Sequence, residues 1–319
     1  MIPKSWFLDA KSTIDPYIKL TPLTYDKEND LYIKWENHQI TSSFKTRGAL
    51  NKVFHLEKWE QEAGLLAASA GNHGQGVAYA GNLINVPVTI YVPEKTPKVK
   101  IQAIKSFGAK VILVPGGYGN AEKAALKEIA VSSATWISPY NDGQIIAGQG
   151  TIALESLEQL KFYNDSRLDK ATWLLPVGGG GLISGVALAL KHKHPDLILV
   201  GVQAETSPFM FGLYHKNSQE EILERPTIAD GLAGPVEVGS TTIPIIHQFV
   251  DDLILVSENE IAQGIAYAWN NYGEKIEGSA AVVFSAFLSG KVKNKPLVII
   301  VSGGNIEDNL FNRIVTQES

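Results

Sequence analysis

One segment of the chain reads Thr172-Trp173-Leu174-Leu175-Pro176-Val177-Gly178-Gly179-Gly180-Gly181-Leu182. Its first five residues predict a short β-strand that is buried on both faces, and the apolar run Leu182–His192 predicts a helix after it. A strand that turns through glycines into a helix is typical of α/β folds with parallel strands. Because four glycines carry no Cβ, their amides at a helix N-terminus can approach an anion closely. The segment therefore predicts an α/β fold with a phosphate-binding turn.

This turn matches neither of the common nucleotide-binding fingerprints. A Walker A sequence would continue with Gly-Lys-Ser/Thr, and a dinucleotide-binding turn would read Gly-x-Gly-x-x-Gly. The turn Gly178–Gly181 is followed by Leu182 and shows neither pattern. A single phosphate group is therefore the better prediction, with a plain flexible turn as the alternative.

Short apolar runs alternate with longer amphipathic runs along the rest of the chain. This alternation predicts right-handed βαβ units and mostly parallel sheets flanked by helices. The predicted strands are Leu31–Trp35, Gly64–Ala68, Val86–Val92, Lys110–Val114, Thr172–Pro176, Leu197–Val202, Leu253–Val256 and Leu297–Val301. The predicted helices are Gln75–Ile84, Lys98–Phe107, Asn120–Ala130, Gln144–Leu160, Leu182–His192, Glu258–Asn270 and Ala280–Leu288.

Two further strands are followed by glycine-rich turns that carry polar side chains, Ser69–Gly76 and Ser302–Asn305. Ligands of open α/β sheets bind beyond the carboxyl ends of the strands. We therefore expect these two turns and Gly178–Gly181 to converge on one crevice. A fourth turn, Pro115–Gly119, carries no useful acid, base or donor side chain, and we expect it to be a plain connection.

The turn Ser69–Gly76 places a hydroxyl, an amide and an imidazole around glycines. Such a turn can bind a carboxylate or a phenolic oxygen through hydrogen bonds. The plainer interpretation is a helix N-terminus that Asn72 caps. His73 taken alone is more typical of a structural histidine than of a ligand-binding one.

The composition is that of an ordinary globular enzyme, with 319 residues, 45% hydrophobic and 19% charged. The formal net charge of −5 gives no indication of nucleic-acid binding. There are no cysteines, which excludes disulfides, thiolate nucleophiles and Cys-ligated metals. The N-terminus lacks a signal-peptide pattern, and no run reaches the roughly 18 apolar residues of a spanning helix. We therefore expect a cytoplasmic protein that binds neither nucleic acid nor membrane.

A lysine lies in the octapeptide Ser42–Ala49, between Phe44 and the pair Arg47-Gly48, where we expect the chain to pass from loop to helix. A lysine amine near its usual pKa of about 10.4 is a poor nucleophile, but burial or a neighbouring cation lowers the pKa and permits Schiff-base chemistry. The octapeptide alone is equally compatible with Lys45 being a solvated residue near a helix start.

Taken together, the motifs resemble the threonine/serine dehydratase (ammonia-lyase) group of pyridoxal-phosphate enzymes, which share the tryptophan-synthase-β-like fold, fold type II. The resemblance extends from about Thr21 to Asn305. The matching segments are Thr21–Leu23, Ser43–Ala49, Ser69–Gly76, Ala147–Thr151, Pro176–Leu182, Thr227–Gly231 and Ser302–Asn305. It implies two lobes, each with a mostly parallel sheet flanked by helices.

The resemblance implies a role for each matching position. Lys45 would form the Schiff base with pyridoxal 5'-phosphate and act as the catalytic base, and Phe44 would pack near the ring. Asn72 would hydrogen-bond the ring hydroxyl oxygen, and Ser302 would hydrogen-bond the ring nitrogen. The implied phosphate-binding residues are Gly178, Gly179, Gly180, Gly181 and Leu182. The implied substrate-carboxylate loop consists of Ser69, Ala70, Gly71, Asn72 and His73.

The implied reaction is β-elimination from a β-hydroxy amino acid such as L-threonine or L-serine, giving a 2-oxo acid and ammonia. Because a serine cannot hold a proton on the ring nitrogen as an aspartate can, Ser302 implies a moderate electron sink that favours elimination over transamination. The closest alternative is serine racemase, in which a serine precedes the Gly-Asn-His of the loop. That position is Ala70 here, which cannot transfer a proton.

Further departures from the family pattern leave the substrate open. Gln203 and Phe209 stand where many relatives have carboxylates for a divalent cation, so we expect no metal site. Gly234 would leave room near the substrate side chain, so larger substrates such as hydroxyaspartate or phenylserine stay possible. A non-catalytic ligand-binding relative and a β-replacement enzyme such as cysteine synthase are weaker alternatives.

The predicted large, cofactor-binding domain comprises residues 1–50 and 148–319. The predicted small, mobile domain, residues 51–147, carries the loop with Asn72. Because only 14 residues follow Asn305, we expect no C-terminal regulatory domain. The resemblance also implies a homodimer.

Overall fold

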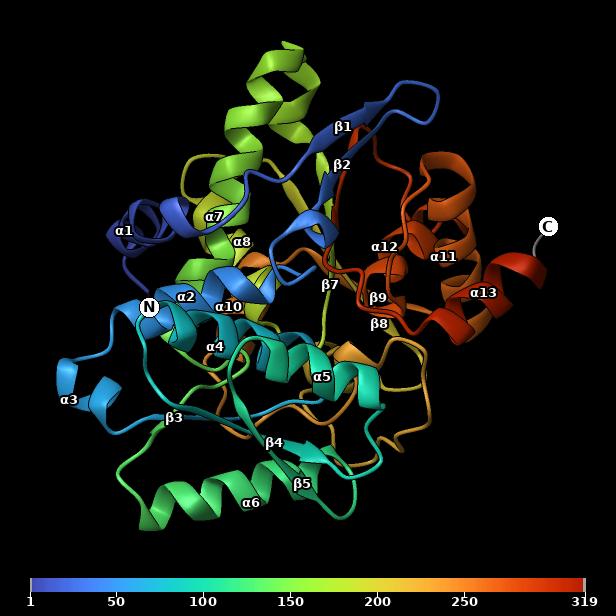
Figure 1. The fold of residues 1–319 in the computed structure, drawn as a ribbon. Coiled ribbons are helices and arrows are strands. Elements are labelled where there is room, and N and C mark those ends of the chain that lie inside the picture. The colour runs from blue at the N-terminus through green and yellow to red at the C-terminus, as the bar shows by residue number, and fades with distance from the viewer. Residues whose placement is uncertain (1, 318–319) are drawn as a thin grey trace.

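The fold is an α/β arrangement of two sheets with helices packed on them (Figure 1). The computed structural model describes residues 2–317. Within them, one sheet has six strands in the order β1-β2-β10-β7-β8-β9, and the other has four in the order β5-β4-β3-β6. The strands are β1 Leu23–Asp26, β2 Leu31–Trp35, β3 Leu65–Ala68, β4 Val88–Pro93, β5 Lys110–Val114, β6 Thr135–Trp136, β7 Thr172–Pro176, β8 Ile198–Ala204, β9 Asp252–Val256 and β10 Leu297–Val301.

All neighbouring strands run parallel except β1 and β2, which pair antiparallel with Leu23 opposite Lys34. The prediction of mostly parallel sheets is confirmed. The helices are α1 Lys4–Ile14, α2 Lys45–Phe54, α3 Lys58–Glu62, α4 Asn72–Leu83, α5 Lys98–Ser106, α6 Tyr118–Val131, α7 Gly143–Leu160, α8 Gly181–Lys191, α9 Phe209–Lys216, α10 Thr242–Phe249, α11 Glu258–Tyr272, α12 Gly278–Leu288 and α13 Asp308–Gln317.

The strands bury both faces because successive side chains point to opposite sides of a sheet. In β3, Leu65 packs in the same apolar cluster as Val77 of α4, whereas Leu66 packs with Ala121 of α6. Figure 1 shows α4 and α5 on one side of this sheet and α6 on the other. The continuous apolar runs that predicted these strands are thus explained by helices on both faces.

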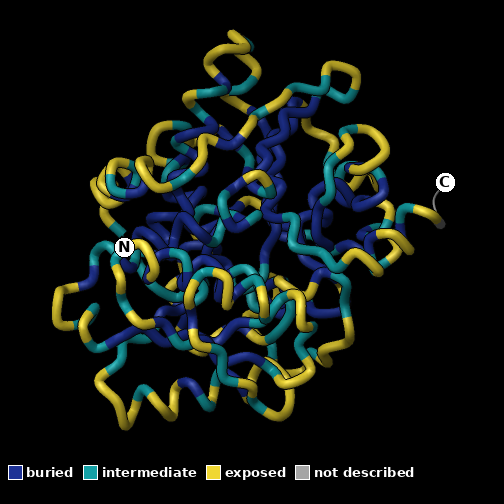
Figure 2. Tube along the Cα trace, viewed as in Figure 1, coloured by how far each residue is buried: buried dark blue, intermediate teal, exposed yellow. Residues whose placement is uncertain are grey.

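The six-stranded sheet follows the same rule. In β10, Ile299 packs in the cluster that contains Phe284 of α12, and Val298 packs in the cluster that contains Val186 of α8. All five residues of β10 are buried, and Figure 2 shows the buried trace running through the centre of this part of the molecule.

All eight predicted strands and all seven predicted helices are present, with bounds that differ by a few residues. The elements that were not predicted from the sequence are β1, β6, α1, α3, α9, α10 and α13. The prediction that Ser69–Gly76 is a turn was partly wrong, because α4 begins at Asn72. Its glycines disfavour a helix locally, but Gly76 lets α4 approach α2 closely: a Cβ there would lie 3.1 Å from the carbonyl oxygen of Lys45.

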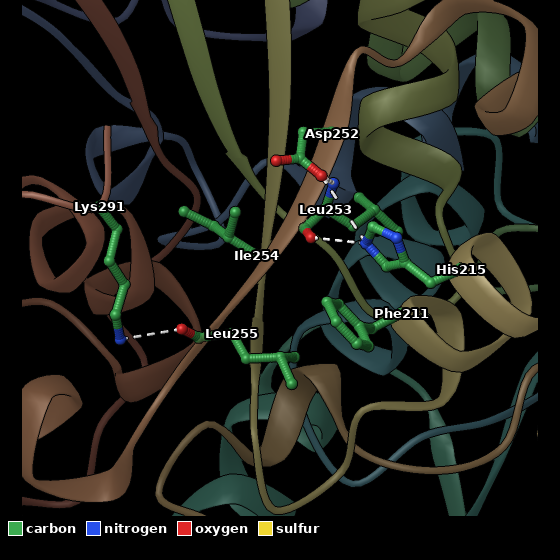
Figure 3. Close-up of a pocket in the computed structure, with 7 residues that line it drawn as sticks. All are labelled: Phe211, His215, Asp252, Leu253, Ile254, Leu255 and Lys291. Atoms are coloured by element: carbon green, nitrogen blue, oxygen red, sulfur yellow. Dashed lines mark hydrogen bonds and ion pairs between the residues drawn. The ribbon is translucent and has the colours of Figure 1, made fainter. Parts of the chain in front are cut away.

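The outer edge of β9 is covered by side chains (Figure 3). His215 donates to the carbonyl oxygen of Leu253 at 3.0 Å, and Lys291 donates to that of Leu255 at 3.0 Å. Asp252 accepts from the Leu253 amide at 2.8 Å. Side chains that occupy the free groups of an edge strand prevent another strand from pairing with it. The depression that these residues line, about 430 Å³, contains none of the predicted site residues.

The predicted domain boundaries fall inside helices, since α2 spans position 50 and α7 spans position 147. The division into two domains and the mobility of the smaller one therefore stay predictions. Among residues 2–317, none of the helices has the length and apolar character needed to cross a bilayer.

Candidate active site

The segment before α2 is held beside the carboxyl end of β10. The Phe44 amide donates to the Ser302 carbonyl oxygen at 3.0 Å, and the Gly304 amide donates to the Ser42 carbonyl oxygen at 2.9 Å. Ser43 and Gly303 form an antiparallel bridge between them. These backbone bonds bring two sequence-predicted site segments together although they are far apart in the chain.

Lys45 is the first residue of α2, so the expected passage from loop to helix is found there. Its Nζ donates to the carbonyl oxygen of Pro139 at 2.8 Å and lies 5.3 Å from the centroid of the Phe44 ring. Burial lowers the pKa of the Lys45 amine to about 8, while the negative charge of Glu277 opposes that shift. At neutral pH a useful fraction of this amine is uncharged and nucleophilic.

The glycine turn Gly178–Gly181 connects β7 to α8, and Gly180 occupies the N-cap position with φ +88°. Thr242 donates to the Gly179 carbonyl oxygen at 2.7 Å, which fixes the orientation of that peptide group. A Cβ on Gly179 would lie 2.3 Å from the Tyr140 ring. The backbone is therefore packed where only glycine fits, as a turn that holds a phosphate through its amides requires.

Asn72 opens α4, and its side chain does not cap the helix. Its Nδ2 donates to Oε1 of Glu277 at 2.7 Å, and its Oδ1 accepts from Nδ2 of Asn305 at 2.7 Å. The interpretation of Asn72 as a simple cap is wrong, because the N-cap position belongs to Gly71. The amide instead links the start of α4 to the loop before α12 and to the segment after β10.

His73 points away from this network into the core. It is buried, and its Nε2 donates to the carbonyl oxygen of Ile137 at 2.9 Å. Burial and the charge of Lys45 lower the pKa of the imidazole to about 3. The ring is therefore neutral at physiological pH, so any part of His73 in binding a substrate carboxylate would fall to its backbone amide at the helix N-terminus.

The segment ahead of α4 is short. The Gly71 amide donates to Oγ of Ser69 at 3.1 Å, and a Cβ on Gly71 would meet nothing within 4 Å. Ala70 lies between them. Since the amides of the first helical turn lack intrahelical acceptors, this segment offers backbone donors and the hydroxyl of Ser69 to a ligand.

Gly234 has a different explanation from the expected one. Its φ of +100° is strained for any residue with a side chain, and its amide donates to Oγ of Ser207 at 3.0 Å. The backbone conformation thus accounts for the glycine, whether or not a substrate lies beside it.

Arg47 forms the centre of a buried ionic network beneath Lys45. Its guanidinium binds both carboxylate oxygens of Glu36 at 2.8 Å and Oε2 of Glu155 at 2.9 Å, and Lys34 pairs with the other oxygen of Glu155. All four side chains are almost completely inaccessible to solvent. Two cations balance two carboxylates here, so the network ties α2 to β2 and α7 and fixes the position of the helix that carries Lys45.

Three residues that shape the site were not found from the sequence. Pro139 and Tyr140 belong to a segment without glycines, and Glu277 lies in the loop before α12. Burial raises the pKa of the Glu277 carboxyl to about 7, with a further increase from Asp230 and opposing effects from Asn72, Lys100 and the Asn305 amide. The signal in the sequence was a single acidic residue, Glu277, directly before the strongly apolar run that forms α12.

The fold and site together define an enzyme that places a lysine amine near a glycine turn suited to a phosphate. The chain belongs to the family of pyridoxal-phosphate dependent enzymes, whose pattern it matches over residues 13–303. Lys45 and the Gly178–Gly181 turn fit such a cofactor, since the cofactor carries an aldehyde and a phosphate. The site residues implied by the resemblance stay predictions.

Named relatives agree with this membership. The chain is 39% identical to the L-threonine ammonia-lyase of Thermotoga maritima, over 97% of this chain and 77% of that protein. It is 40% identical to the catabolic L-threonine dehydratase TdcB of Staphylococcus aureus, over 94% of this chain and 88% of that protein.

Solved structures give the same picture. Processed threonine deaminase isoform 2 from Solanum lycopersicum has a TM-score of 0.88 and 31% identity, covering 98% of this chain and 92% of that one. Maize serine racemase has a TM-score of 0.87 and 29% identity, covering 98% of this chain and 97% of the other. The expectation of a type II fold is confirmed.

Proposed function

We propose that this chain is an ammonia-lyase that eliminates water from L-threonine and L-serine. The products are a 2-oxo acid and ammonia, so threonine gives 2-oxobutanoate and serine gives pyruvate. The observation that carries the proposal is the combination of a partly deprotonated Lys45 with Ala70 in the loop ahead of α4. One base without a second acid at Cα suits elimination better than inversion.

Bound pyridoxal phosphate supplies an electron sink for the bond that breaks at Cα. The residues of the chain do the remaining work. Lys45 holds the cofactor and then removes the Cα proton as general base. The amides of Gly178–Gly181 hold the phosphate, and the N-terminus of α4 with Ser69 binds the substrate carboxylate.

Serine racemase is the second candidate, because solved serine racemases are close in fold. The two candidates differ in one measurable product. A panel of D- and L-β-hydroxy amino acids, including hydroxyaspartate and phenylserine, should be scored for 2-oxo acid and for inversion. We expect 2-oxo acid from L-threonine and L-serine and only trace D-serine. Inversion faster than 2-oxo acid release would favour the racemase, and absence of both products would contradict an enzymatic role.

We also infer that the protein acts in the cytoplasm as a homodimer, as the family resemblance implies. The mass in solution, measured by light scattering at several concentrations, tests the second statement. A constant monomer mass would contradict it.

A further inference from the structure

The amide of Asn72 is clamped from two sides. Its Nδ2 faces the carboxylate of Glu277, which only accepts hydrogen bonds when ionised, and its Oδ1 faces Nδ2 of Asn305, which only donates. The second N–H of Asn305 is directed to the carbonyl oxygen of Thr41 at 2.9 Å. Asn305 is therefore fixed as a donor, so exchanging the nitrogen and oxygen of the Asn72 amide loses the bond to Asn305 in every case, and the bond to Glu277 as well when Glu277 is ionised.

This clamp leaves one N–H of Asn72 for a ligand. An amide nitrogen carries two N–H groups, and Glu277 takes one of them. The remaining N–H is a donor that can serve an oxygen acceptor, and the clamp fixes which end of the amide carries it. A donor of this kind favours an oxygen that carries negative charge.

Glu277 is itself held firmly. Its backbone amide donates to the Gly303 carbonyl oxygen at 3.1 Å, and its side chain is buried. A Cβ on Gly303 would lie 2.6 Å from Oε1 of Glu277, so the glycine is what admits the carboxylate to this position. Glu277 and Asn305 flank elements of the six-stranded sheet, whereas Asn72 begins a helix of the four-stranded sheet.

We propose that Glu277 is a positioning residue, which acts through Asn72 and makes that amide donate its free N–H to the oxygen on the cofactor ring. The inference rests on the proposed function, because it requires bound pyridoxal phosphate. Glu277 does not touch the reacting atoms in this role. It determines which end of Asn72 meets the cofactor and therefore the electronic state of the ring oxygen.

The test compares the visible absorbance spectrum of the cofactor-loaded protein in five variants. Glu277→Ala removes the acceptor, and Glu277→Asp keeps the charge but shortens its reach by one methylene. We expect both to shift the absorbance maximum and to weaken cofactor binding about tenfold, because a hydrogen bond to a charged group is lost. Glu258→Asp is the matched control, since Glu258 also accepts two hydrogen bonds, from Thr206 and from the Ile228 amide, away from the site.

The decisive comparison is the double variant. If Glu277 acts through Asn72, then Glu277→Asp should leave the spectrum of Asn72→Ala unchanged. An additive shift in the double variant, or a wild-type spectrum in Glu277→Asp, would overturn the inference. A wild-type protein that binds no cofactor would instead overturn the proposed function, so the two failures are distinguishable. If Glu277→Ala does not fold, Glu277→Asp carries the whole test.

Discussion

The amine of Lys45 donates its hydrogen bond to the carbonyl oxygen of Pro139, 94 residues further along the chain. Pro139 lies between β6 and α7, and Lys45 opens α2. A neutral carbonyl compensates a buried ammonium less well than a carboxylate does. This pairing keeps the amine in place while leaving its pKa low.

The pH dependence of cofactor attachment follows from this low pKa. The amine is protonated below about pH 8 and free above it. The rate at which cofactor-free protein forms its covalent adduct with pyridoxal phosphate should therefore rise with pH through about 8 and then level off. Stopped-flow absorbance measures this rate. A midpoint near the ordinary value of 10.5 would contradict the prediction.

Lys45→Ala should form no specific adduct and lose turnover by about 10³-fold or more, while its circular dichroism stays unchanged.

The glycine turn predicts a selective loss of cofactor affinity. Gly179→Ala places a Cβ against the Tyr140 ring, so the turn must shift and its amides should lose contact with the phosphate. We expect the cofactor to dissociate at least about tenfold more readily, since contacts to a charged group are weakened. Equilibrium dialysis gives the dissociation constant. Gly117→Ala is the control, because a Cβ there meets nothing within 4 Å. Equal affinities in both variants would argue against the phosphate assignment.

The alanine at position 70 leads us to predict that a substitution there can add racemase activity. Ala70→Ser supplies a hydroxyl at the position where the racemases carry a serine, and we expect D-serine formation from L-serine to rise at least about tenfold, as a positioned acid or base permits. Chiral chromatography of the product measures it. Ala70→Gly, which adds no hydroxyl, should show no such increase. Unchanged D-serine in Ala70→Ser would mean that Ala70 does not face Cα.

We predict that Ser302 sets the balance between elimination and transamination. Ser302→Asp would hold a proton on the ring nitrogen and strengthen the electron sink, which favours transamination. We expect the ratio of transamination to elimination to increase, measured as amine-form cofactor per 2-oxo acid released. Ser302→Thr keeps the hydroxyl and should retain the wild-type ratio. A ratio of transamination to elimination in Ser302→Asp equal to that of the wild type would contradict this prediction.

The buried ionic network predicts a large effect on stability. Arg47→Met leaves Glu36 and Glu155 without their main partner, and we expect the free energy of unfolding to fall by about 3–5 kcal/mol. Denaturant titration measures the change. Arg167→Met is the matched control, since Arg167 also pairs with two carboxylates, of Asp30 and Asp165, but is about half exposed. Its loss should cost much less than the loss of Arg47, because solvent screens an exposed ion pair. Similar losses for both would refute the role of burial.

Local patterns were sufficient to predict much of the architecture. The apolar runs of β7 and β10 predicted buried parallel strands, because a strand covered on both faces needs apolar residues at every position. The glycine turn after β7 and the lysine near a helix start could also be predicted, because each depends on residues that are neighbours in the chain. The strand β1 was missed because it is short and only partly buried.

The sequence by itself determined the class of fold, the lysine and the glycine turn, because backbone conformation and burial of a strand are encoded in consecutive residues. Only the tertiary structure decided that α4 begins at Asn72 and that Glu277, 205 residues away, holds its side chain. Close packing of α4 on α2 favours a helix where glycines oppose it. A hydrogen bond between distant residues has no local pattern, since it exists only once the two sheets are packed together.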